Sequence, residues 1–324
     1  MMRMDLDNVE ILRRKIGIRK ELIDINIRNS LMGLWSYQGW LYKNRLLKNY
    51  YELIYTLLGG GTVTCRDTSA YYRNFNAKSY KMVYNPCQIH VGTDTEDLPF
   101  DGYTLTNYGA SVASSVEALA QENYSETVVG GTAPKDGSIV GICGRLNDTG
   151  NDQRYILLND VLLSVASGDP LSVHLKFYSP WVYNLAVIWR GWLENSNPTG
   201  TKDIAGVDYQ LRCLSGITVA GNFDIALGDG AGAWSPTDYT LTNARTLTTS
   251  RTKWESDSGM EILLRAWYIP AEDESIPELG LIGKLYDVSG TQYDTLLARI
   301  ALETSPLSLT ANHLYIIRMK ILGT

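Results

Sequence analysis

The chain has 324 residues, more than the roughly 250–300 at which one hydrophobic core usually stops growing, so two domains are expected. Its hydrophobic content of 44% excludes a disordered protein, and its four scattered cysteines exclude zinc fingers, redox motifs and a dense disulfide scaffold. The net charge of −6 is uneven, because residues 1–60 hold 10 Lys+Arg against 6 Asp+Glu.

Residues 1–61 are predicted to form an N-terminal arm followed by a helix. Between residues 8 and 31 the pattern is mixed: residues 9–16 have helical spacing, whereas Ile23, Ile25 and Ile27 alternate with polar residues as in a strand. Between 36 and 58 apolar residues recur every three or four positions, and three glycines follow at 59–61. That pattern predicts one helix over 36–58.

The N-terminal part also carries the candidate contacts with partners. Aromatic residues often anchor protein interfaces, and the partner-interface candidates are Trp35, Tyr37, Trp40 and Tyr42. Packing on the chain's own core is the alternative for these residues. The excess of basic residues before residue 61 indicates a solvated helix face or docking onto an acidic partner, with nucleic-acid contact as the less favoured form of docking.

After residue 61 short β-branched and aromatic runs alternate with clusters of Gly, Asn, Asp, Pro and Ser. This alternation is typical of an antiparallel sandwich or barrel. A helix is considered only for residues 111–123, and the polar stretch 194–203 is a candidate linker.

A long internal repeat gives the domain organisation. The pentapeptide Tyr-Thr-Leu-Thr-Asn occurs at 103–107 and at 239–243, and "GICGRL" at 141–146 corresponds to "GLIGKL" at 280–285. Each copy ends in an alternating strand, at 171–177 and at 314–321. We therefore predict two tandem antiparallel β-sandwich, jelly-roll-like modules at 62–197 and 198–324, each burying its own core.

The repeated loop is interpreted as architectural. Gly92 and Gly228 begin a turn-rich loop, and the Thr-Leu-Thr core of the pentapeptide alternates as an edge or half-buried strand would. The glycines at 228–232 lack the Lys and Ser/Thr of a phosphate loop, so a nucleotide site is not expected. The acidic stretches 94–101 and 148–152 do not match an EF-hand, and solvated loops are favoured over calcium sites.

No catalytic motif is found. His90, His174 and His313 lie far apart in sequence, no G-x-S-x-G occurs, and no pair of carboxylates is singled out. The chain is therefore expected not to be an enzyme and to have no cofactor, no metal and no membrane span.

The second repeat carries a spaced pattern of residues: Gly228, Pro236, Asp238, Tyr239, Leu241, Glu278, Gly280, Leu281 and the run 296–300. This pattern resembles a module of virion proteins from tailed bacteriophages and archaeal viruses. The resemblance covers roughly residues 88–177 and 220–322 and implies no catalytic residues. The first copy matches less well, because Asp101 and Gly102 stand at the Thr-Asp positions and the Glu is missing.

The resemblance implies a homo-oligomeric subunit of a virus particle, in a tail, neck, baseplate or capsid vertex, that binds itself and other virion proteins. Its place would be the virion, after synthesis and assembly in the host cytoplasm. One alternative is a host-receptor or glycan-binding module that uses the loop aromatics Phe100 and Trp234 as platforms. A second alternative is a β-sandwich hydrolase of surface polymers, which would need two carboxylates in one cleft.

Overall fold

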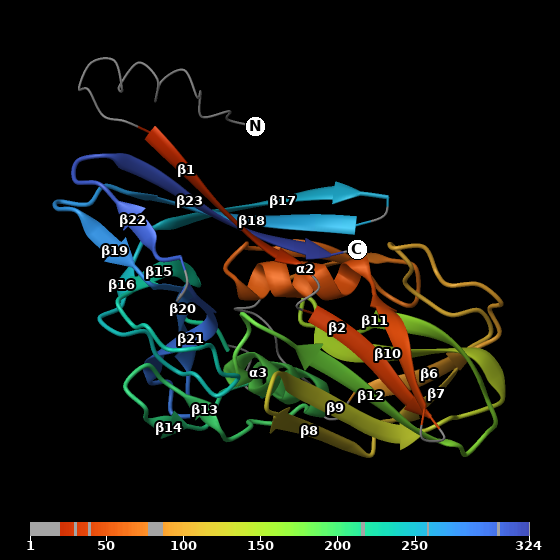
Figure 1. Ribbon diagram of the computed structural model, residues 1–324. Coiled ribbons are helices and arrows are strands. Elements are labelled where there is room, and N and C mark those ends of the chain that lie inside the picture. Colours follow the sequence, from red (N-terminus) through yellow and green to blue (C-terminus); the bar gives the residue numbers. More distant parts are fainter. Residues whose placement is uncertain are drawn as a thin grey trace.

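The computed structural model describes residues 20–28, 31–37, 40–76, 87–214, 218–257, 259–302 and 305–323 (Figure 1). Between residues 20 and 45 it describes the strand backbone and, of the side chains, Ile23 alone. Strands make up 50% of the chain and helices 8%, which confirms a mainly β protein with several antiparallel sheets.

The N-terminal part is largely strand, not helix. Strands β1 (Lys20–Arg28), β2 (Leu31–Tyr37) and β3 (Trp40–Leu46) precede helix α2 (Lys48–Leu57). The predicted helix over 36–58 is therefore wrong except for α2, and the strand-like alternation around Ile23 is confirmed. In residues 40–46 Trp40, Tyr42 and Leu46 take alternate positions to Lys43 and Arg45, a period of two, and pairing with strands on both sides of the β2–β3 hairpin selects this pattern. Residues 1–19 of the predicted arm lie outside the described residues.

The strands that follow α2 in the first half are β4 (Val63–Arg66), β5 (Tyr72–Phe75), β6 (Gln88–Gly92), β7 (Gly109–Val112), β8 (Ser115–Ala120), β9 (Ser125–Thr132), β10 (Gly137–Asn147), β11 (Gln153–Val165) and β12 (Pro170–Phe177). Most of them form a nine-stranded sheet with the order β7-β6-β10-β11-β3-β2-β12-β9-β8, and β4 pairs with β5 alone. The β2–β3 hairpin joins the two groups of strands, because β3 pairs with β11 and β2 with β12.

The second half contains β13 (Thr201–Lys202), β14 (Asp208–Tyr209), β15 (Asp224–Gly228), β16 (Arg245–Thr246), β17 (Thr249–Ser256), β18 (Gly259–Tyr268), β19 (Glu274–Ile276), β20 (Glu278–Tyr286), β21 (Gln292–Ala301), β22 (Leu307–Leu309) and β23 (Leu314–Gly323). The order β16-β15-β20-β21 matches β7-β6-β10-β11, and β23-β18-β17 matches β12-β9-β8. Strand β1 pairs in parallel with β23, at the position that β2 takes beside β12.

Helix α3 (Tyr183–Glu194) connects the two halves and was not predicted. It packs against β8 and β9 of the first half and against β21 of the second. Nine of its residues between Asn184 and Leu193 are buried, and only Tyr183, Arg190 and Glu194 are partly exposed, so its polar face is narrow. Neither α2 nor α3, the helices that the structure describes, has the length and apolar character needed to cross a membrane.

The helix considered for residues 111–123 is wrong, because this segment forms β7 and β8. In β8 the side chains of Val116 and Ala118 are buried, while Ser115, Glu117 and Leu119 are exposed. Burial thus alternates with a period of two, as expected for a strand with one buried face.

The main hydrophobic core is continuous through both halves. One cluster of touching buried residues includes Val91 and Val173 of the first half, Trp189 of α3, and Leu227 and Ile262 of the second half. The expectation that each half buries a separate core is therefore wrong. Each half adds a small cluster of its own, around Leu105 in the first and around Leu241 in the second.

Leu105 and Leu241 belong to the repeated pentapeptide, which is a loop and not the predicted strand. Both leucines are buried, at 2% and 3% exposure. The Asn that ends each pentapeptide has a left-handed backbone, with φ of 46° at Asn107 and 49° at Asn243. The loop therefore inserts a leucine into the core and then turns sharply, which supports its architectural interpretation.

The two halves share specific hydrogen bonds as well as strand order. Asn49 Nδ2 donates to the carbonyl oxygens of Arg66 and Leu157 at 3.1 and 3.2 Å. Asn184 Nδ2 donates to those of Lys202 and Leu296 at 3.0 and 2.9 Å. Each asparagine is the second residue of its helix and ties that helix to a hairpin and to a long strand.

We expect Asn49→Ala and Asn184→Ala each to lower the free energy of unfolding by about 2–3 kcal/mol, because each leaves buried backbone groups without partners. Urea denaturation at pH 7 measures the change. Asn74→Ala is the matched control, since Asn74 is exposed and its loss should cost under about 0.5 kcal/mol. A cost at Asn184 as small as the control's would contradict the equivalence of the two contacts.

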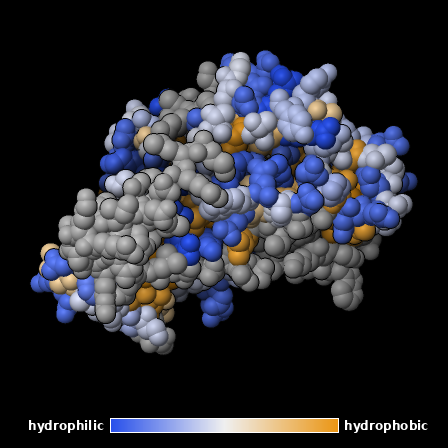
Figure 2. All heavy atoms as spheres, turned by 90° about the horizontal axis from the view of Figure 1, so that it is seen from above, coloured by the Kyte–Doolittle hydropathy of each residue, from blue (hydrophilic) through white to orange (hydrophobic). Residues whose placement is uncertain are grey.

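The outer face of the sheet β1-β23-β18-β17 lies at the top of the molecule in Figure 1, and Figure 2 looks onto it. Among the atoms that this view colours, hydrophilic residues predominate and hydrophobic residues show as small separate spots. Trp254 and Trp267 lie on the two strands β17 and β18, with exposures of 51% and 37%. Scattered apolar residues of this kind are ordinary for a protein surface.

Candidate functional site

The four predicted interface residues lie in the β2–β3 hairpin. The backbone register pairs Trp35 with Tyr42 and Tyr37 with Trp40, and it places Trp35 opposite Val173 of β12. The hairpin thus brings the four residues together in the middle of the nine-stranded sheet. Their side chains lie outside the described part of the chain, so a partner interface here stays a prediction.

The two loop aromatics have different environments. Phe100 is 3% exposed, and its ring centroid lies 6.1 Å from that of Tyr51 in α2. Its ring is therefore part of the core and is not available as a glycan platform. Trp234 is half-buried, and its indole N–H is enclosed without a hydrogen-bond partner among the described residues.

The glycine-rich loop 228–232 is closed by an ion pair. Glu278 Oε1 accepts the backbone N–H groups of Gly230 and Thr242 at 3.0 and 2.7 Å. The other carboxylate oxygen lies 2.7 Å from Arg299 Nε, and both side chains are almost fully buried. Arg299 in turn donates to the carbonyl oxygens of Gly232 and Ala233 and to Asp238. The loop amides are thus used by a protein carboxylate, and the loop is not a phosphate cradle.

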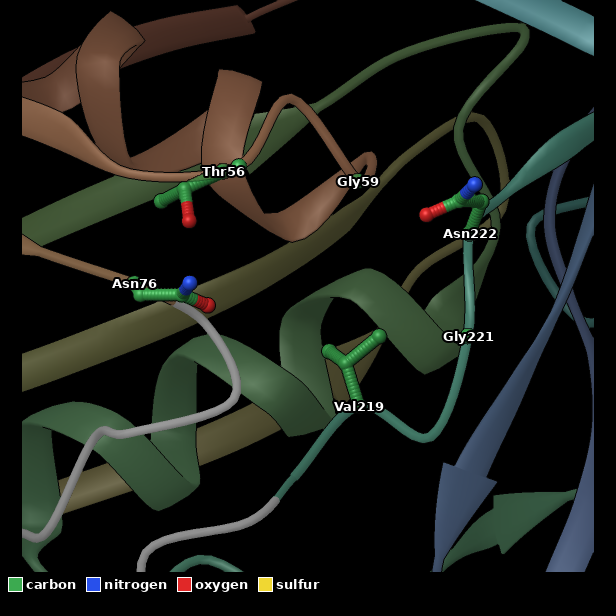
Figure 3. Close-up of a pocket in the computed structure, with 7 residues that line it drawn as sticks. Thr56, Gly59, Asn76, Val219, Gly221 and Asn222 are labelled. Carbon is green, nitrogen blue, oxygen red and sulfur yellow. The ribbon is translucent and has the colours of Figure 1, made fainter.

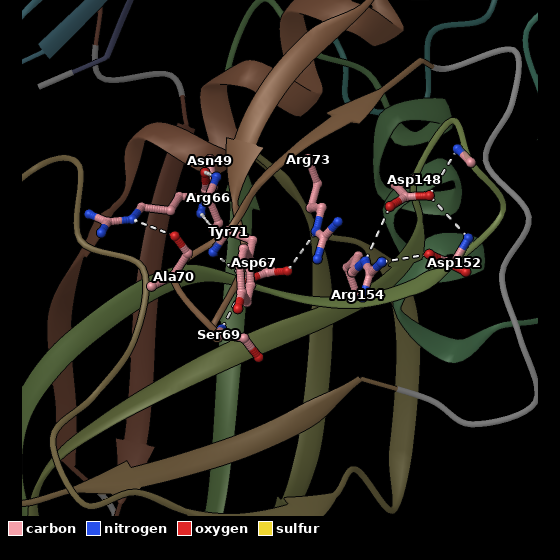
Figure 4. Close-up of polar contacts among 11 residues, drawn as sticks. Asn49, Arg66, Asp67, Ser69, Ala70, Tyr71, Arg73, Asp148, Asp152 and Arg154 are labelled. Atoms are coloured by element: carbon pink, nitrogen blue, oxygen red, sulfur yellow. Dashed lines mark hydrogen bonds and ion pairs between the residues drawn. The ribbon is translucent and has the colours of Figure 1, made fainter.

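The acidic loops of the first half are likewise occupied by protein groups. The Asp94 carboxylate accepts the N–H and the hydroxyl of Thr106 at 2.8 and 2.6 Å. The Asp148 carboxylate accepts two N–H groups of its own loop and lies 3.1 Å from Arg154 Nε (Figure 4). Within the described residues no group of three or more His, Cys, Asp or Glu side chains could hold a metal ion.

His90 forms a buried pair with a cysteine. Its Nδ1 lies 3.4 Å from Cys143 Sγ, and its ring stacks on Tyr108 with a centroid distance of 4.5 Å. Burial lowers the pKa of His90 to about 4 and raises the pKa of the Cys143 thiol. Both groups are therefore neutral at pH 7. A nucleophilic thiolate is disfavoured at this place, and packing is the role that the environment supports.

A serine, a histidine and a glutamate form a chain of contacts on the neighbouring strands β12 and β9. Ser172 Oγ lies 3.2 Å from His174 Nε2, and His174 Nδ1 lies 3.0 Å from Glu126 Oε2. Burial alone would raise the pKa of Glu126, but its hydrogen bond with His174 and the nearby Lys176 lower it. The order of contacts is that of a hydrolase triad. However, β12 lies between β2 and β9 in the sheet, so its backbone amides are used in strand pairing and offer no oxyanion hole.

A charged cluster lies where α2 meets β17. Lys253 Nζ contacts the buried carboxylate of Glu52, lies 2.9 Å from Glu255 Oε1, and Lys48 Nζ lies 2.7 Å from Glu255 Oε2. Burial raises the pKa of Glu52. Burial would also raise that of Glu255, but hydrogen bonds from Lys48 and Lys253 lower it to about 2. A pocket of about 470 Å³ opens beside Lys48 and Glu255, with Asp101 and Asp257 at its wall.

This cluster gives the stability a pH dependence. The folded pKa of Glu255 is lower than its unfolded value of about 4.3, so its contribution is present above that value and is lost as the pH falls toward about 2. We expect Glu255→Gln to cost no more than about 1 kcal/mol at pH 7, because the carboxylate is partly exposed. The difference from wild type should shrink between pH 4.5 and pH 2.5 in urea denaturation. A difference that grew on acidification would contradict the assigned direction.

A smaller pocket lies between the end of α2 and residues 219–222, where the two halves approach each other (Figure 3). Its volume is about 80 Å³, and its lining includes Thr56, Asn76 and Asn222. Binding pockets for small molecules usually measure about 300–1,000 Å³. The space therefore suits a few water molecules between polar side chains and not a substrate.

The hairpin β4–β5 carries a surface that the sequence analysis missed. We call it the tyrosine–arginine patch, and it consists of Arg66, Tyr71, Tyr72, Arg73 and Tyr103. Tyr71 and Tyr72 are 62% and 71% exposed. The guanidinium carbon of Arg66 lies 3.7 Å from the ring centroid of Tyr103, and that of Arg73 lies 5.0 Å from the ring centroid of Tyr71. Two adjacent tyrosines after a turn signal were the only hint in the sequence.

Comparisons with known proteins identify no family. No protein-family model matches the sequence, and no curated protein matches it. Among solved structures, a 2'-deoxycytidine 5'-triphosphate deaminase from Agrobacterium tumefaciens aligns over 86% of this chain and 95% of its own, at 10% identity and a TM-score of 0.12. A likeness of that size supports no conclusion about fold or activity.

Proposed function

We propose that the chain is a structural subunit of a virus particle, built from two tandem jelly-roll-like modules, that assembles with copies of itself and with other virion proteins. The resemblance of the second repeat to virion modules motivates the proposal. We place the start of each module at its helix, α2 or α3, because the repeated contacts of Asn49 and Asn184 begin there. The modules would then begin before residue 62 and before residue 198.

The proposal of a structural role rests mainly on one observation. The repeated loop is stabilised by different carboxylate side chains in the two halves. In the second half the carboxylate of Glu278 accepts the N–H of Thr242, and in the first the carboxylate of Asp94 accepts the N–H of Thr106. The loop backbones agree, because Thr93 N–H donates to Thr106 O at 3.0 Å as Asp229 N–H does to Thr242 O at 2.9 Å. The loop keeps its geometry although different side chains hold it in the two halves. This favours a loop that is selected for its shape rather than for a particular reaction.

The residues that carry the resemblance also serve this loop. Leu241 is buried beneath it, Glu278 binds its amides, and Asp238 joins Glu278 through Arg299. A module whose characteristic residues stabilise its own loop is suited to a structural role. For the glycan-binding alternative the buried Phe100 ring is unfavourable, and for the hydrolase alternative the Glu278 and Asp238 carboxylates are both committed to Arg299.

The test is the composition of particles. Virus particles purified by density gradient from a culture that carries the encoding genome should contain this chain in stoichiometric amount by quantitative mass spectrometry. Immunogold electron microscopy should then place it at one site on the particle. Absence of the chain from intact particles, with the chain abundant in the cell extract, would reject the proposal.

A further inference from the structure

The buried carboxyl group of Glu52 contacts the amine of Lys253 across the two halves of the chain. Glu52 lies on α2 and Lys253 on β17, 201 residues further along the sequence. The Glu52 side chain is 1% exposed. In the ion pairs of Lys48, Lys202 and Lys284 the carboxylate side chains are 38%, 70% and 45% exposed. The contact with Glu52 differs from those pairs because water is excluded from the acid.

The environment of Glu52 favours a neutral acid. Its Oε2 atom is enclosed and has no hydrogen-bond partner among the described residues. Burial raises the pKa of Glu52, because a carboxylate oxygen without water or a donor is costly. The repeated helix does not require an acid at this place. Glu52 stands three residues after Asn49, whereas the buried Val187 stands three residues after Asn184 in α3. The carboxyl group is therefore not explained by packing alone.

The two reacting groups are held in contact by their neighbours on β17. Arg251 and Glu255 flank Lys253 at alternate positions of the strand. Arg251 Nε donates to the carbonyl oxygen of Leu58 at the end of α2, and Glu255 Oε2 lies 2.7 Å from Lys48 Nζ at its start. The three side chains thus face α2. Groups positioned in this way react as if they were present at about 10⁵–10⁸ M, which favours a condensation that is unfavourable between free molecules in water.

We propose that Glu52 and Lys253 condense to an amide, an intramolecular isopeptide bond that links α2 to β17. The new bond joins Nζ of the lysine to Cδ of the glutamate, and the bond between Cδ and one carboxyl oxygen breaks. The hydroxyl of the protonated acid leaves as water together with one amine proton. A second amine proton passes to Glu255 and from there to solvent. No oxidant, reductant or activating nucleotide is needed.

Glu255 is the proton acceptor in this reaction. Its Oε1 lies 2.9 Å from Lys253 Nζ, within the range for direct proton transfer. Burial would lower the pKa of Lys253, but its contacts with Glu52 and Glu255 raise it. The amine is therefore an ammonium group at rest and must lose a proton before Nζ can attack. Because the low pKa of Glu255 makes it a weak base, we expect bond formation to be slow.

The experiment is intact-mass spectrometry of the denatured full chain. Chain refolded from urea should start at the mass of its sequence and lose the mass of one water molecule with time. Chain kept in urea should retain its full mass, because the fold brings the two groups together. Protease digestion of the refolded chain should release a branched peptide that joins the segments around Glu52 and Lys253, and fragmentation of this peptide locates the bond.

Variants separate the amide from a permanent ion pair. Lys253→Arg keeps a positive charge beside Glu52 but offers no amine, so it should retain its full mass. Glu52→Val, which introduces the residue that α3 carries, should retain its full mass as well. Glu255→Gln should slow the loss of water about 100-fold, the lower end of what a positioned proton acceptor contributes. Lys284→Arg is the matched control at an exposed pair and should lose water at the wild-type rate.

Mass alone does not decide, because the Asp-Gly sequences at 101–102, 136–137 and 229–230 also lose water when they form succinimides. Loss of water in Lys253→Arg, or absence of the branched peptide from wild type, would therefore overturn the proposal. A wild type that refolds by circular dichroism and keeps the mass of its sequence would show a permanent ion pair instead. Loss at the wild-type rate in Glu255→Gln would overturn the role of Glu255. The proposed function does not depend on this bond, since particle composition is measured separately.

Discussion

Arg299→Met is expected to lower the free energy of unfolding by about 3–5 kcal/mol, a large part of the 5–15 kcal/mol that stabilises a typical protein. The substitution leaves the Glu278 carboxylate, 1% exposed, without its counter-charge. It also removes the donors that hold the carbonyl groups of Gly232 and Ala233. Guanidinium denaturation followed by circular dichroism measures the change.

A second variant separates the charge from the loop contacts. Glu278→Gln keeps an oxygen that can accept the N–H groups of Gly230 and Thr242 but removes the buried charge. Adding it to Arg299→Met should therefore recover about 1–2 kcal/mol. Lys284→Met is the matched surface control, because its partner Asp294 is also exposed and such pairs contribute about 1 kcal/mol or less. An Arg299→Met variant as stable as this control would contradict a structural role of the pair.

Strands could be predicted from the sequence where the residues fit an alternating pattern and no helical one. In β12 buried and half-buried residues alternate, as the sequence of 171–177 indicated. The β2–β3 hairpin was not predicted because residues 40–46 fit both a helical and an alternating pattern. Pairing with β11 and β12 decides between the two patterns. Such pairing joins residues more than a hundred positions apart, and no local window contains that information.

The sequence did not predict helix α3 because its exposed face is narrow. Most of its residues are buried, since it lies between the strands β8 and β9 of one half and β21 of the other, and only Tyr183, Arg190 and Glu194 are partly exposed. Few polar positions therefore mark a helical period, and the sequence "NLAVIW" also fits a buried strand. Only the packing of both halves around it reveals what the segment is.

The polar contacts were the least predictable part of the candidate site. The sequence showed Glu278 and Arg299 as part of a resemblance, yet their common role in closing the loop depends on β20 pairing with β21. Tyr71 and Tyr72 are consecutive, and in a regular strand one of them would face inward. Both are exposed because Tyr71 belongs to the turn and Tyr72 begins β5 at the sheet edge.

A continuous core has a consequence for how the chain unfolds. Because one hydrophobic cluster passes from the first half through α3 into the second, we expect wild type to unfold in a single cooperative transition. Trp189 is central to this path. It is 1% exposed, stacks on Tyr50 of α2 at a centroid distance of 4.6 Å, and meets Trp192 at 5.3 Å.

Trp189→Ala should therefore cost about 3–5 kcal/mol, the usual range for removing a large aromatic side chain from a core. Since the cavity would lie where α2 and α3 touch, the loss should also weaken the coupling between the halves and lower the denaturant m-value. Trp189→Phe retains a ring to stack on Tyr50 and should cost about half as much, and Trp267→Ala, at an exposed site, under about 1 kcal/mol. Two resolved transitions already in wild type, with Trp189→Ala affecting only one of them, would mean that the halves fold independently despite their shared core.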